Sequence, residues 1–122
     1  MKKYEFFNSP IHGIGCKTTQ NIKKEEIIAL EPFIVIDEPV CDTIKNFVWA
    51  GRRYKLNGRL LINGLGSWTN HSDTNNIIKS LDKTGKYIIF TAIRDIEKDE
   101  ELFVNYGPHW WNIRNKVANS TC

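Results

Sequence analysis

The fold is decided by the stretch WTNHSDTNN, residues 68–76, a polar run that begins with a tryptophan. Its Asn, His and Ser side chains can bond to buried backbone in an irregular segment, which leaves main-chain groups free to face a ligand. His71, Ser72 and Asp73 include the residue types of a catalytic triad, but that relay needs groups that converge from separate elements. The stretch therefore predicts a braced, irregular segment, with either a purely structural role or a role in binding.

The rest of the 122-residue chain has the composition of one ordinary globular domain, with 41% hydrophobic and 25% charged residues. Lys and Arg number 17 against 14 Asp and Glu, and this small surplus is scattered. A scattered surplus is typical of a solvated surface, so we expect no direct nucleic-acid partner.

The sequence contains no apolar run near the roughly 20 residues that cross a bilayer, and its N-terminus lacks the apolar core of a signal peptide. We therefore expect an intracellular protein with no membrane partner, in the cytoplasm or a host nucleus. Cys16, Cys41 and Cys122 are odd in number and far apart, without a C-x-x-C pair. They predict reduced thiols and no metal site.

Short runs rich in β-branched and aromatic residues predict strands. They cover residues 4–7, 27–30, 33–36, 87–93 and 102–104. Pro32 separates the second run from the third and predicts an edge or a bend between two strands. The pattern is typical of a mainly β fold.

A short helix is predicted from a cap at Asp42 to about Ala50, because Ile44, Phe47 and Val48 fall on one helical face. Gly51 would end this helix. A hairpin is expected over residues 54–62, around the Asn-Gly turn at 57–58.

Residues 22–28 and 96–102 repeat one pattern, in which apolar residues flank four or five polar ones. Each copy predicts a tight reversal that leads into a strand. With two copies only, the repeat does not indicate a solenoid.

Three separated segments resemble, in order and spacing, motifs of the SET-domain family of lysine methyltransferases. Gly13-Ile14-Gly15 resembles the family's G-x-G turn, residues 68–76 resemble F-x-N-H-S-x-x-P-N, and DEELFVNYG at 99–107 resembles G-E-E-L-x-x-D-Y-G. Both copies of the repeat resemble the I-x-x-G-E-x-I turns. The chain is identified as a minimal, single-domain member, similar to the virus- and bacterium-type proteins.

Several positions depart from the family's motifs. Glu25 and Asp99 stand where the family usually has Gly, and Asp adopts the left-handed conformation more readily than Glu does. We therefore expect the first turn to be strained or differently shaped. Asp73 replaces a common Cys, Asn75 a Pro and Asn105 an Asp.

The resemblance implies a SET-domain (β-clip-like) fold of several short sheets, one or two short helices and a knot-like C-terminal crossing. It implies a single domain over residues 1–122, with an insert at about 38–62 and a post-SET-like aromatic tail at about 107–122.

The resemblance also implies S-adenosylmethionine as the methyl donor, without a metal. The residues expected to bind the cofactor are Gly13, Ile14, Gly15, Asn70, His71, Tyr106, Trp110 and Trp111. Tyr106 is the expected catalytic residue, because its hydroxyl can polarise the methyl group and orient the amine. The expected substrate channel comprises Phe47, Tyr54, Trp68 and Tyr106, although Phe47 also fits the core of the predicted helix.

Three functions stay open on the sequence. The first is methylation of lysine in a protein such as a histone, the second is methylation of small polyamines, and the third is an inactive binding module. A homodimer is expected because so small a core has little to cover its insert.

Overall fold

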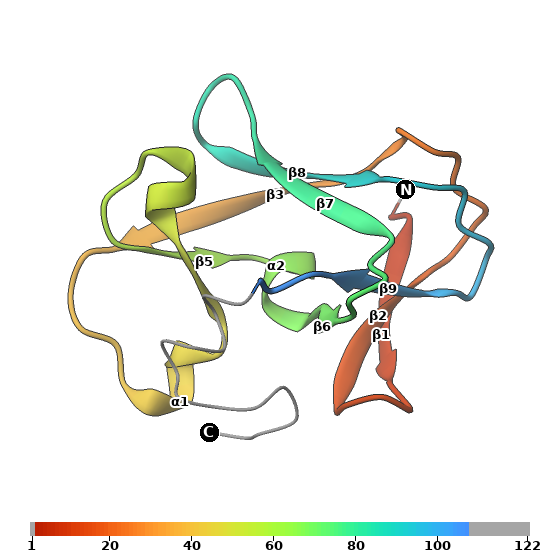
Figure 1. The fold of residues 1–122 in the computed structure, drawn as a ribbon, viewed down its shortest axis with the longest axis horizontal. Coiled ribbons are helices and arrows are strands. Elements are labelled where there is room, and N and C mark those ends of the chain that lie inside the picture. The colour runs from red at the N-terminus through yellow and green to blue at the C-terminus, as the bar shows by residue number, and fades with distance from the viewer. Residues whose placement is uncertain (1, 108–122) are drawn as a thin grey trace.

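Residues 2–107 are described by a computed structural model, which has two β-sheets and three short helical turns (Figure 1). The four-stranded sheet has the order β1 (Tyr4–Asn8), β2 (Ile14–Thr18), β9 (Glu101–Val104) and β6 (Asn70–His71). The five-stranded sheet has the order β4 (Val48–Ala50), β5 (Arg59–Ile62), β3 (Ile27–Ile36), β8 (Tyr87–Ala92) and β7 (Ile77–Leu81). The expectation of a mainly β fold with several short sheets and few helices is confirmed.

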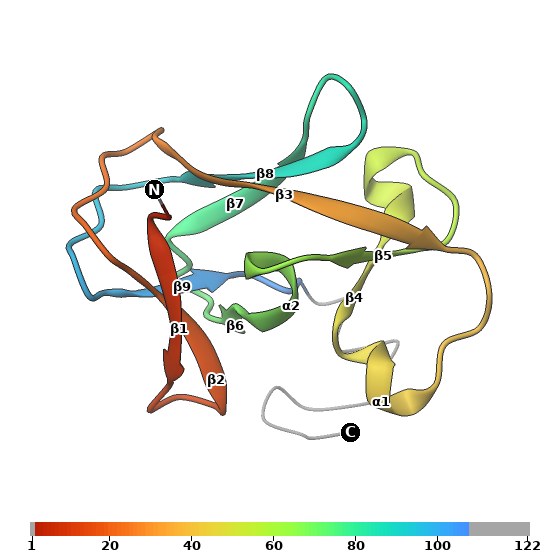
Figure 2. The same cartoon turned by 180° about the vertical axis from the view of Figure 1, so that it is seen from behind.

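The four-stranded sheet joins segments that are distant in sequence. β1 and β2 form an antiparallel hairpin, β2 pairs with β9 through Cys16 opposite Leu102, and β6 lies parallel to β9 with Asn70 opposite Phe103. Seen from behind in Figure 2, β1, β2, β9 and β6 lie together below the long strands β3 and β8. This sheet therefore gathers all three sequence motifs.

In the five-stranded sheet, β3 is one continuous strand, so the prediction of two strands split at Pro32 is wrong. Residues 27–32 of β3 pair with β8, and residues 33–36 pair with β5. Pro32, which has no N–H to donate, stands where β3 changes partner, and its carbonyl accepts the Asn63 N–H at 3.0 Å. The proline thus marks a change of pairing rather than a break.

The core lies on the inward faces of these strands. β8 alternates strictly, with Ile88, Phe90 and Ala92 buried and the residues between them partly exposed or exposed. This alternation is the period of two expected of a strand that is buried on one face. Across the molecule, Ile22, Leu60, Ile62, Leu65, Ile77, Ile96 and Leu102 are also fully buried.

The predicted helix over 42–50 is wrong beyond its first turn. α1 covers only Asp42–Lys45, and Val48–Ala50 form strand β4, with Trp49 opposite Leu60 of β5. Cys41, not Asp42, is the N-cap, and it makes no side-chain cap bond. The pairing of β4 with β5 and the burial of Trp49 outweigh the helical preference of a face that comprises only three residues.

The hairpin around residues 57–58 exists, but its first strand is β4 instead of a strand from Tyr54. The 3-10 helix η1 (Gly51–Tyr54) fills the connection, and the Gly51 N–H donates to the Gly58 carbonyl at 3.0 Å. Gly58 has φ +90°, a conformation that favours glycine. A further helix, α2 (Leu65–Trp68), was not predicted from the sequence.

Both copies of the repeat form the expected tight reversal. Glu25 and Asp99 adopt left-handed conformations with φ +73° and +69°, so the two turns have the same shape and Glu25 bears the greater strain. Ile22 and Ile96 pair with each other through two backbone hydrogen bonds of 2.8 Å. The repeat therefore joins the entries to β3 and β9.

The expected insert, residues 38–62, holds α1, β4, η1 and β5. The knot-like crossing and the aromatic tail depend on residues 108–122, including Trp110 and Trp111, which lie outside the described residues. Within residues 2–107, no helix is long and apolar enough to cross a membrane.

Candidate active site

The glycine turn at residues 13–15 meets the polar stretch through Asn70. The Asn70 Nδ2 donates to the His12 carbonyl and to Glu101 Oε2, both at 2.9 Å. A Cβ on Gly15 would lie 2.6 Å from that carboxylate oxygen and 3.0 Å from Asn70 Nδ2, so a larger residue would displace the hydrogen bond between these two side chains. Gly13 has open space around it and is required for its φ of +48°.

Glu101 is a site residue to which the sequence analysis gave no role. Its carboxylate accepts the Ser9 hydroxyl at 2.8 and 3.0 Å, in addition to the Asn70 amide. It thereby ties the β1–β2 turn to β6. The acidic run at 99–101 was a signal, but nothing local says which of its carboxylates faces inward.

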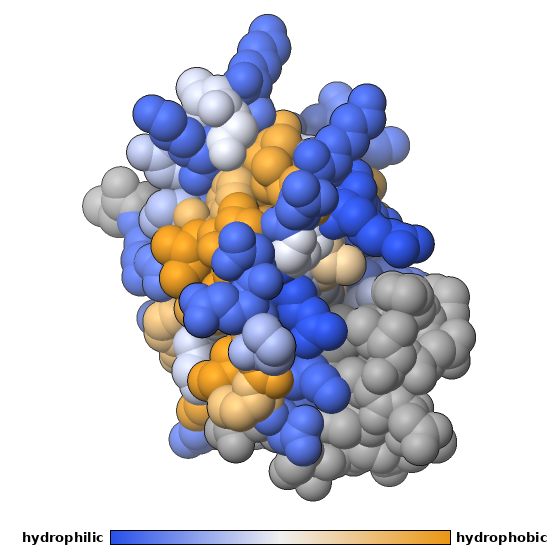
Figure 3. Space-filling model, turned by 90° about the vertical axis from the view of Figure 1, so that its left-hand side faces the viewer, coloured by the Kyte–Doolittle hydropathy of each residue, from blue (hydrophilic) through white to orange (hydrophobic). Residues whose placement is uncertain are grey.

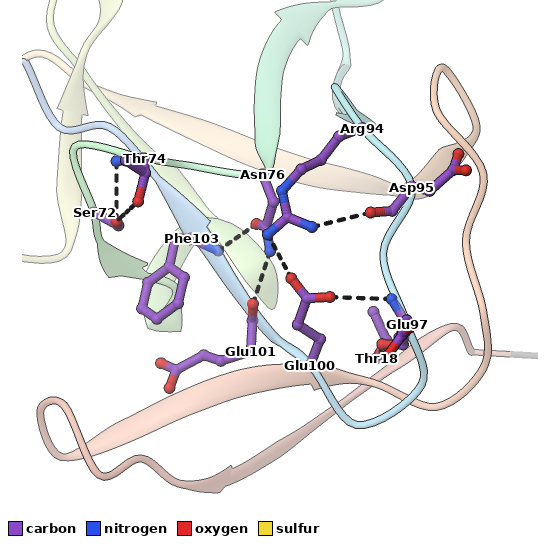
Figure 4. A network of polar contacts seen from close by, with 10 residues as sticks. All are labelled: Thr18, Ser72, Thr74, Asn76, Arg94, Asp95, Glu97, Glu100, Glu101 and Phe103. Carbon is purple, nitrogen blue, oxygen red and sulfur yellow. Dashed lines mark hydrogen bonds and ion pairs between the residues drawn. The ribbon is translucent and has the colours of Figure 1, made fainter.

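Asn76 is the last residue of the polar stretch, and its role was also not predicted from the sequence. It is almost fully buried, its Nδ2 donates to the Glu101 carbonyl at 2.8 Å, and its Oδ1 accepts the Phe103 N–H at 2.8 Å. Figure 4 shows this side chain pointing at β9, so that one amide extends the pairing of β9 beyond the two-residue strand β6. The expectation that this stretch braces irregular backbone fits these bonds.

Figure 4 also shows Arg94 and Glu100 close to Asn76. Arg94 pairs with Glu100, and Glu100 also accepts the Glu97 N–H at 3.1 Å. Ser72 and Thr74 bond to each other at 3.1 Å. These contacts stabilise the loop before β7 and the loop before β9.

His71 connects the polar stretch to Tyr106. Its Nδ1 accepts the Tyr106 backbone N–H at 3.0 Å, so the ring hydrogen resides on Nε2, which lies 2.9 Å from Asp73 Oδ1. Asp73, one of the departures from the family's motif, thus orients the histidine ring. Asn75, another departure, donates to the Ile77 carbonyl at 3.0 Å.

Tyr106 is held at three points. Its backbone is fixed by His71, its hydroxyl donates to the Thr69 carbonyl at 2.7 Å, and its ring packs edge-on against Trp49 at a centroid distance of 5.2 Å. The hydroxyl hydrogen is engaged by the Thr69 carbonyl, so the lone pairs of the hydroxyl oxygen point away from that carbonyl. The half-buried side chain is therefore preorganised to accept rather than to donate.

The expected channel residues are divided between two aromatic groups. Phe47 packs on Trp68 at 5.4 Å, and Trp68 is exposed and also touches Phe6. Trp49, which was not predicted as a site residue, takes the place beside Tyr106, and its Nε1 donates to the Gly66 carbonyl at 2.7 Å. Phe47 follows α1 and is not part of a helical core.

Tyr54 lies at the end of η1 with its hydroxyl buried and without a hydrogen-bond partner within residues 2–107. Burial raises the pKa of this phenol above its ordinary value, and the positive charge of Arg53 opposes part of the increase. Lys79 of β7 is the other such side chain among the described residues, with its Nζ 3.0 Å from the centroid of the Trp49 ring.

A buried pair supports the start of α2, which leads into the polar stretch. Glu31 Oε2 accepts the Tyr4 hydroxyl at 2.9 Å and the Leu65 N–H at 3.2 Å. Burial and the bond to Glu31 raise the pKa of Tyr4 well above its ordinary value. A Cβ on Gly64 would overlap the Glu31 carboxylate, so glycine is required there too.

In the part of the chain that the structure describes, no group of three or more His, Cys, Asp or Glu side chains could hold a metal ion. Cys16 is fully buried, and burial raises the pKa of its thiol to about 12, with the Glu101 charge contributing. Cys41 is a free, exposed thiol, and Cys122 lies outside the described residues.

Comparison with protein families shows that residues 13–107 match the SET domain. A histone-lysine N-methyltransferase of Schizosaccharomyces pombe, specific for H3 lysine-37, is 40% identical over 107 residues, covering 81% of this chain and 69% of that protein. Histone-lysine N-methyltransferases of Aspergillus oryzae and Emericella nidulans, specific for H3 lysine-4, are 27% and 28% identical. The matched region covers 86% of this chain but only 10% of those two proteins.

Solved structures give the same fold. A Plasmodium falciparum protein described as a candidate histone methyltransferase has a TM-score of 0.74 and 30% identity, covering 91% of this chain and 98% of that one. A humanized mutant of the Chaetomium thermophilum Polycomb Repressive Complex 2, bound to an inhibitor, has a TM-score of 0.67 and 26% identity. That match covers 91% of this chain and 16% of the other.

Proposed function

The chain belongs to the SET-domain family of lysine methyltransferases, and on that premise we propose that it methylates lysine side chains of a protein with S-adenosylmethionine as donor. The observation that carries the proposal is the fixation of Tyr106 between His71, Thr69 and Trp49. Histones are the first substrate class to test, because the relatives in three fungi act on histone H3.

The residues present fit this cofactor. The backbone of the 13–15 turn is open, since a Cβ on Gly13 would meet no atom within 4 Å. Asn70 fixes the carbonyl before that turn, and His71 fixes the backbone of Tyr106. We propose that Gly13, Ile14 and Gly15 bind the cofactor through backbone, together with Asn70, His71 and Tyr106.

The proposed roles of Trp110 and Trp111 in cofactor binding concern residues outside the described part of the chain. Phe47, Tyr54 and Trp68 remain proposed walls of the substrate channel, and the position of Trp49 against Tyr106 adds it to them.

The cofactor supplies a methyl group on a sulfonium, which is a good leaving group. The chain's own task is then to orient the amine and to exclude water. With its hydrogen engaged by Thr69, the Tyr106 oxygen would accept a hydrogen bond from an entering amine and orient it toward the methyl group that the cofactor would supply. Loss of water in the channel and the positive sulfonium would both lower the pKa of an entering lysine from about 10.4, so the amine would react in its neutral form without a dedicated base.

Tyr106→Phe tests this mechanism. We expect kcat to fall by about 100- to 1,000-fold, because an orienting oxygen is lost, while KM changes little. The rate is measured with labelled cofactor and a histone substrate. Calorimetric titration of S-adenosylmethionine and the circular dichroism spectrum serve as controls for binding and folding. An unchanged kcat would remove Tyr106 from the mechanism.

Substrate choice is tested on separate panels of core histones, other basic proteins and polyamines. Label in the protein fraction supports the proposal, whereas label only in the small-molecule fraction would favour the polyamine alternative. If no panel is labelled and the cofactor does not bind, the chain is an inactive binding module.

The homodimer also remains a prediction. Exposed apolar side chains lie on β3, among them Leu30, Ile34 and Val35. Figure 3 shows one side of the molecule, where apolar patches are interrupted by hydrophilic residues. Light scattering during size-exclusion chromatography gives the mass directly.

A further inference from the structure

Lys79 occupies an unusual position for a lysine. β7 has Ile77 buried and Ile78 exposed, so the period of two turns Lys79 inward with Ile77 and Leu81. Lysines normally carry their amine into water. Here the Nζ is buried, and it has no hydrogen-bond partner among the described residues.

The amine shares an aromatic neighbour with Tyr106, the proposed catalytic residue. Its Nζ is 3.0 Å from the centroid of the Trp49 ring, and the same indole packs against the Tyr106 ring at 5.2 Å. The Trp49 Nε1 bond to the Gly66 carbonyl fixes the indole in place. Lys79 and Tyr106 are therefore neighbours of one immobile side chain.

Nothing in the described residues holds the amine as a cation except the indole. No carboxylate forms an ion pair with Lys79 there, and the nearby charge of Arg53 is positive. Burial, and to a smaller extent Arg53, shift the pKa of Lys79 well below its ordinary value. Burial therefore favours the neutral amine, which is the nucleophilic form.

We propose that Lys79 is a methyl acceptor of its own chain, modified in cis at the Tyr106 site. This inference rests on the proposed function, because it uses the same donor and the same tyrosine. The flexible four-carbon stem lets the amine move from the indole face toward the Tyr106 oxygen. The tether also favours this acceptor over lysines that must diffuse in.

The step is balanced without a further reactant. The lone pair of neutral Nζ attacks the methyl carbon, and a C–N bond forms as the C–S bond breaks. Sulfur keeps the bonding pair and leaves as the neutral thioether S-adenosylhomocysteine, while the positive charge passes to nitrogen. The methylammonium formed can lose a proton to water before any further transfer.

The test uses the whole chain with S-adenosylmethionine that carries a deuterated methyl group, which separates new methylation from any acquired during expression. After incubation, digestion and tandem mass spectrometry locate the label. We expect label on Lys79 of the wild type, its loss in Lys79→Arg and Tyr106→Phe, and wild-type labelling of Lys79 in Lys86→Arg, the control at an exposed lysine. The labelled fraction should not change on about tenfold dilution, since the transfer is intramolecular.

The possible failures are distinguishable. If an added histone substrate is labelled and Lys79 is not, this inference is wrong and the proposed function stands. If neither Lys79 nor any member of the histone, basic-protein and polyamine panels is labelled, both are wrong. Label on Lys79 that forms in Tyr106→Phe at the wild-type rate shows a reaction independent of the Tyr106 site, and label that decreases on dilution shows transfer between chains; either result overturns the inference.

A second measurement needs no cofactor. Lys79→Met should shift the midpoint of urea unfolding at pH 7 to higher urea, because it replaces a buried amine without a hydrogen-bond partner by an apolar group of similar length. A shift to lower urea would show that the amine is a stabilising cation on Trp49, and the inference would fall.

Discussion

The two sheets of this molecule are held together by different kinds of contact. The five-stranded sheet depends on apolar burial, with Ile62, Ile88 and Phe90 fully buried on its inward face. The four-stranded sheet is locked by polar side chains, chiefly the amides of Asn70 and Asn76. Apolar burial tolerates many partners, whereas each amide bond needs one particular donor and acceptor. The first sheet provides stability, and the second provides the precise placement of a site.

Phe90→Ala should give the largest loss of stability. It empties a fully buried ring position in the five-stranded sheet and should lower the free energy of unfolding by about 4 kcal/mol. Urea denaturation at neutral pH measures the change. Ile78→Ala on the exposed face of β7 is the matched control, with an expected loss below about 1 kcal/mol. Equal losses from the two variants would contradict an apolar basis for this sheet.

Asn76→Ala should cost less, about 3 kcal/mol, because it leaves the Glu101 carbonyl and the Phe103 N–H buried without partners. Hydrogen exchange should accelerate at residues 101–104 more than at residues 88–92. Asn75→Ala removes a single bond, to the Ile77 carbonyl, and should cost about 1 kcal/mol. Uniform acceleration across both sheets would mean that the two are not separately stabilised.

Glycine substitutions in the two turns should have the smallest effects. Glu25→Gly should gain about 0.5–1 kcal/mol, because glycine adopts φ +73° without steric strain. Asp99→Gly should gain less, since Asp tolerates this conformation better and a Lys17 contact at 3.6 Å is lost. Thermal unfolding of both variants measures the difference. A loss of stability in Glu25→Gly would show that the entropy of the unfolded chain outweighs the strain.

The elements that were predicted correctly have local signals. The strand at β8 follows from strict alternation, and the turns at Glu25 and Asp99 follow from a polar run between apolar residues. The prediction of a helix over 42–50 is wrong beyond its first turn. Ile44, Phe47 and Val48 fit a helical face, but the pairing of Trp49 with Leu60 makes this part of the chain a strand. That pairing joins β4 to β5 across the hairpin, so no pattern within residues 42–50 indicates it.

The site also has features that the sequence predicted and residues whose roles it did not predict. The resemblance of the three motifs identified the family, and the matching SET domain over residues 13–107 confirms it. The roles of Glu101, Asn76 and Trp49 were not predicted, because each depends on a contact with a distant segment. Asp73 departs from the family's motif, yet it lies against the histidine that holds Tyr106.

The sequence by itself determined the family, the mainly β character and the polar stretch at 68–76, because these rest on residue types and short spacings. Only the tertiary structure decided which polar groups meet, and that Lys79 turns inward onto Trp49 beside Tyr106. The physical reason is that hydrogen bonds and ring contacts act over a few ångströms in space. Partners far apart along the chain are chosen by the packing of both sheets together.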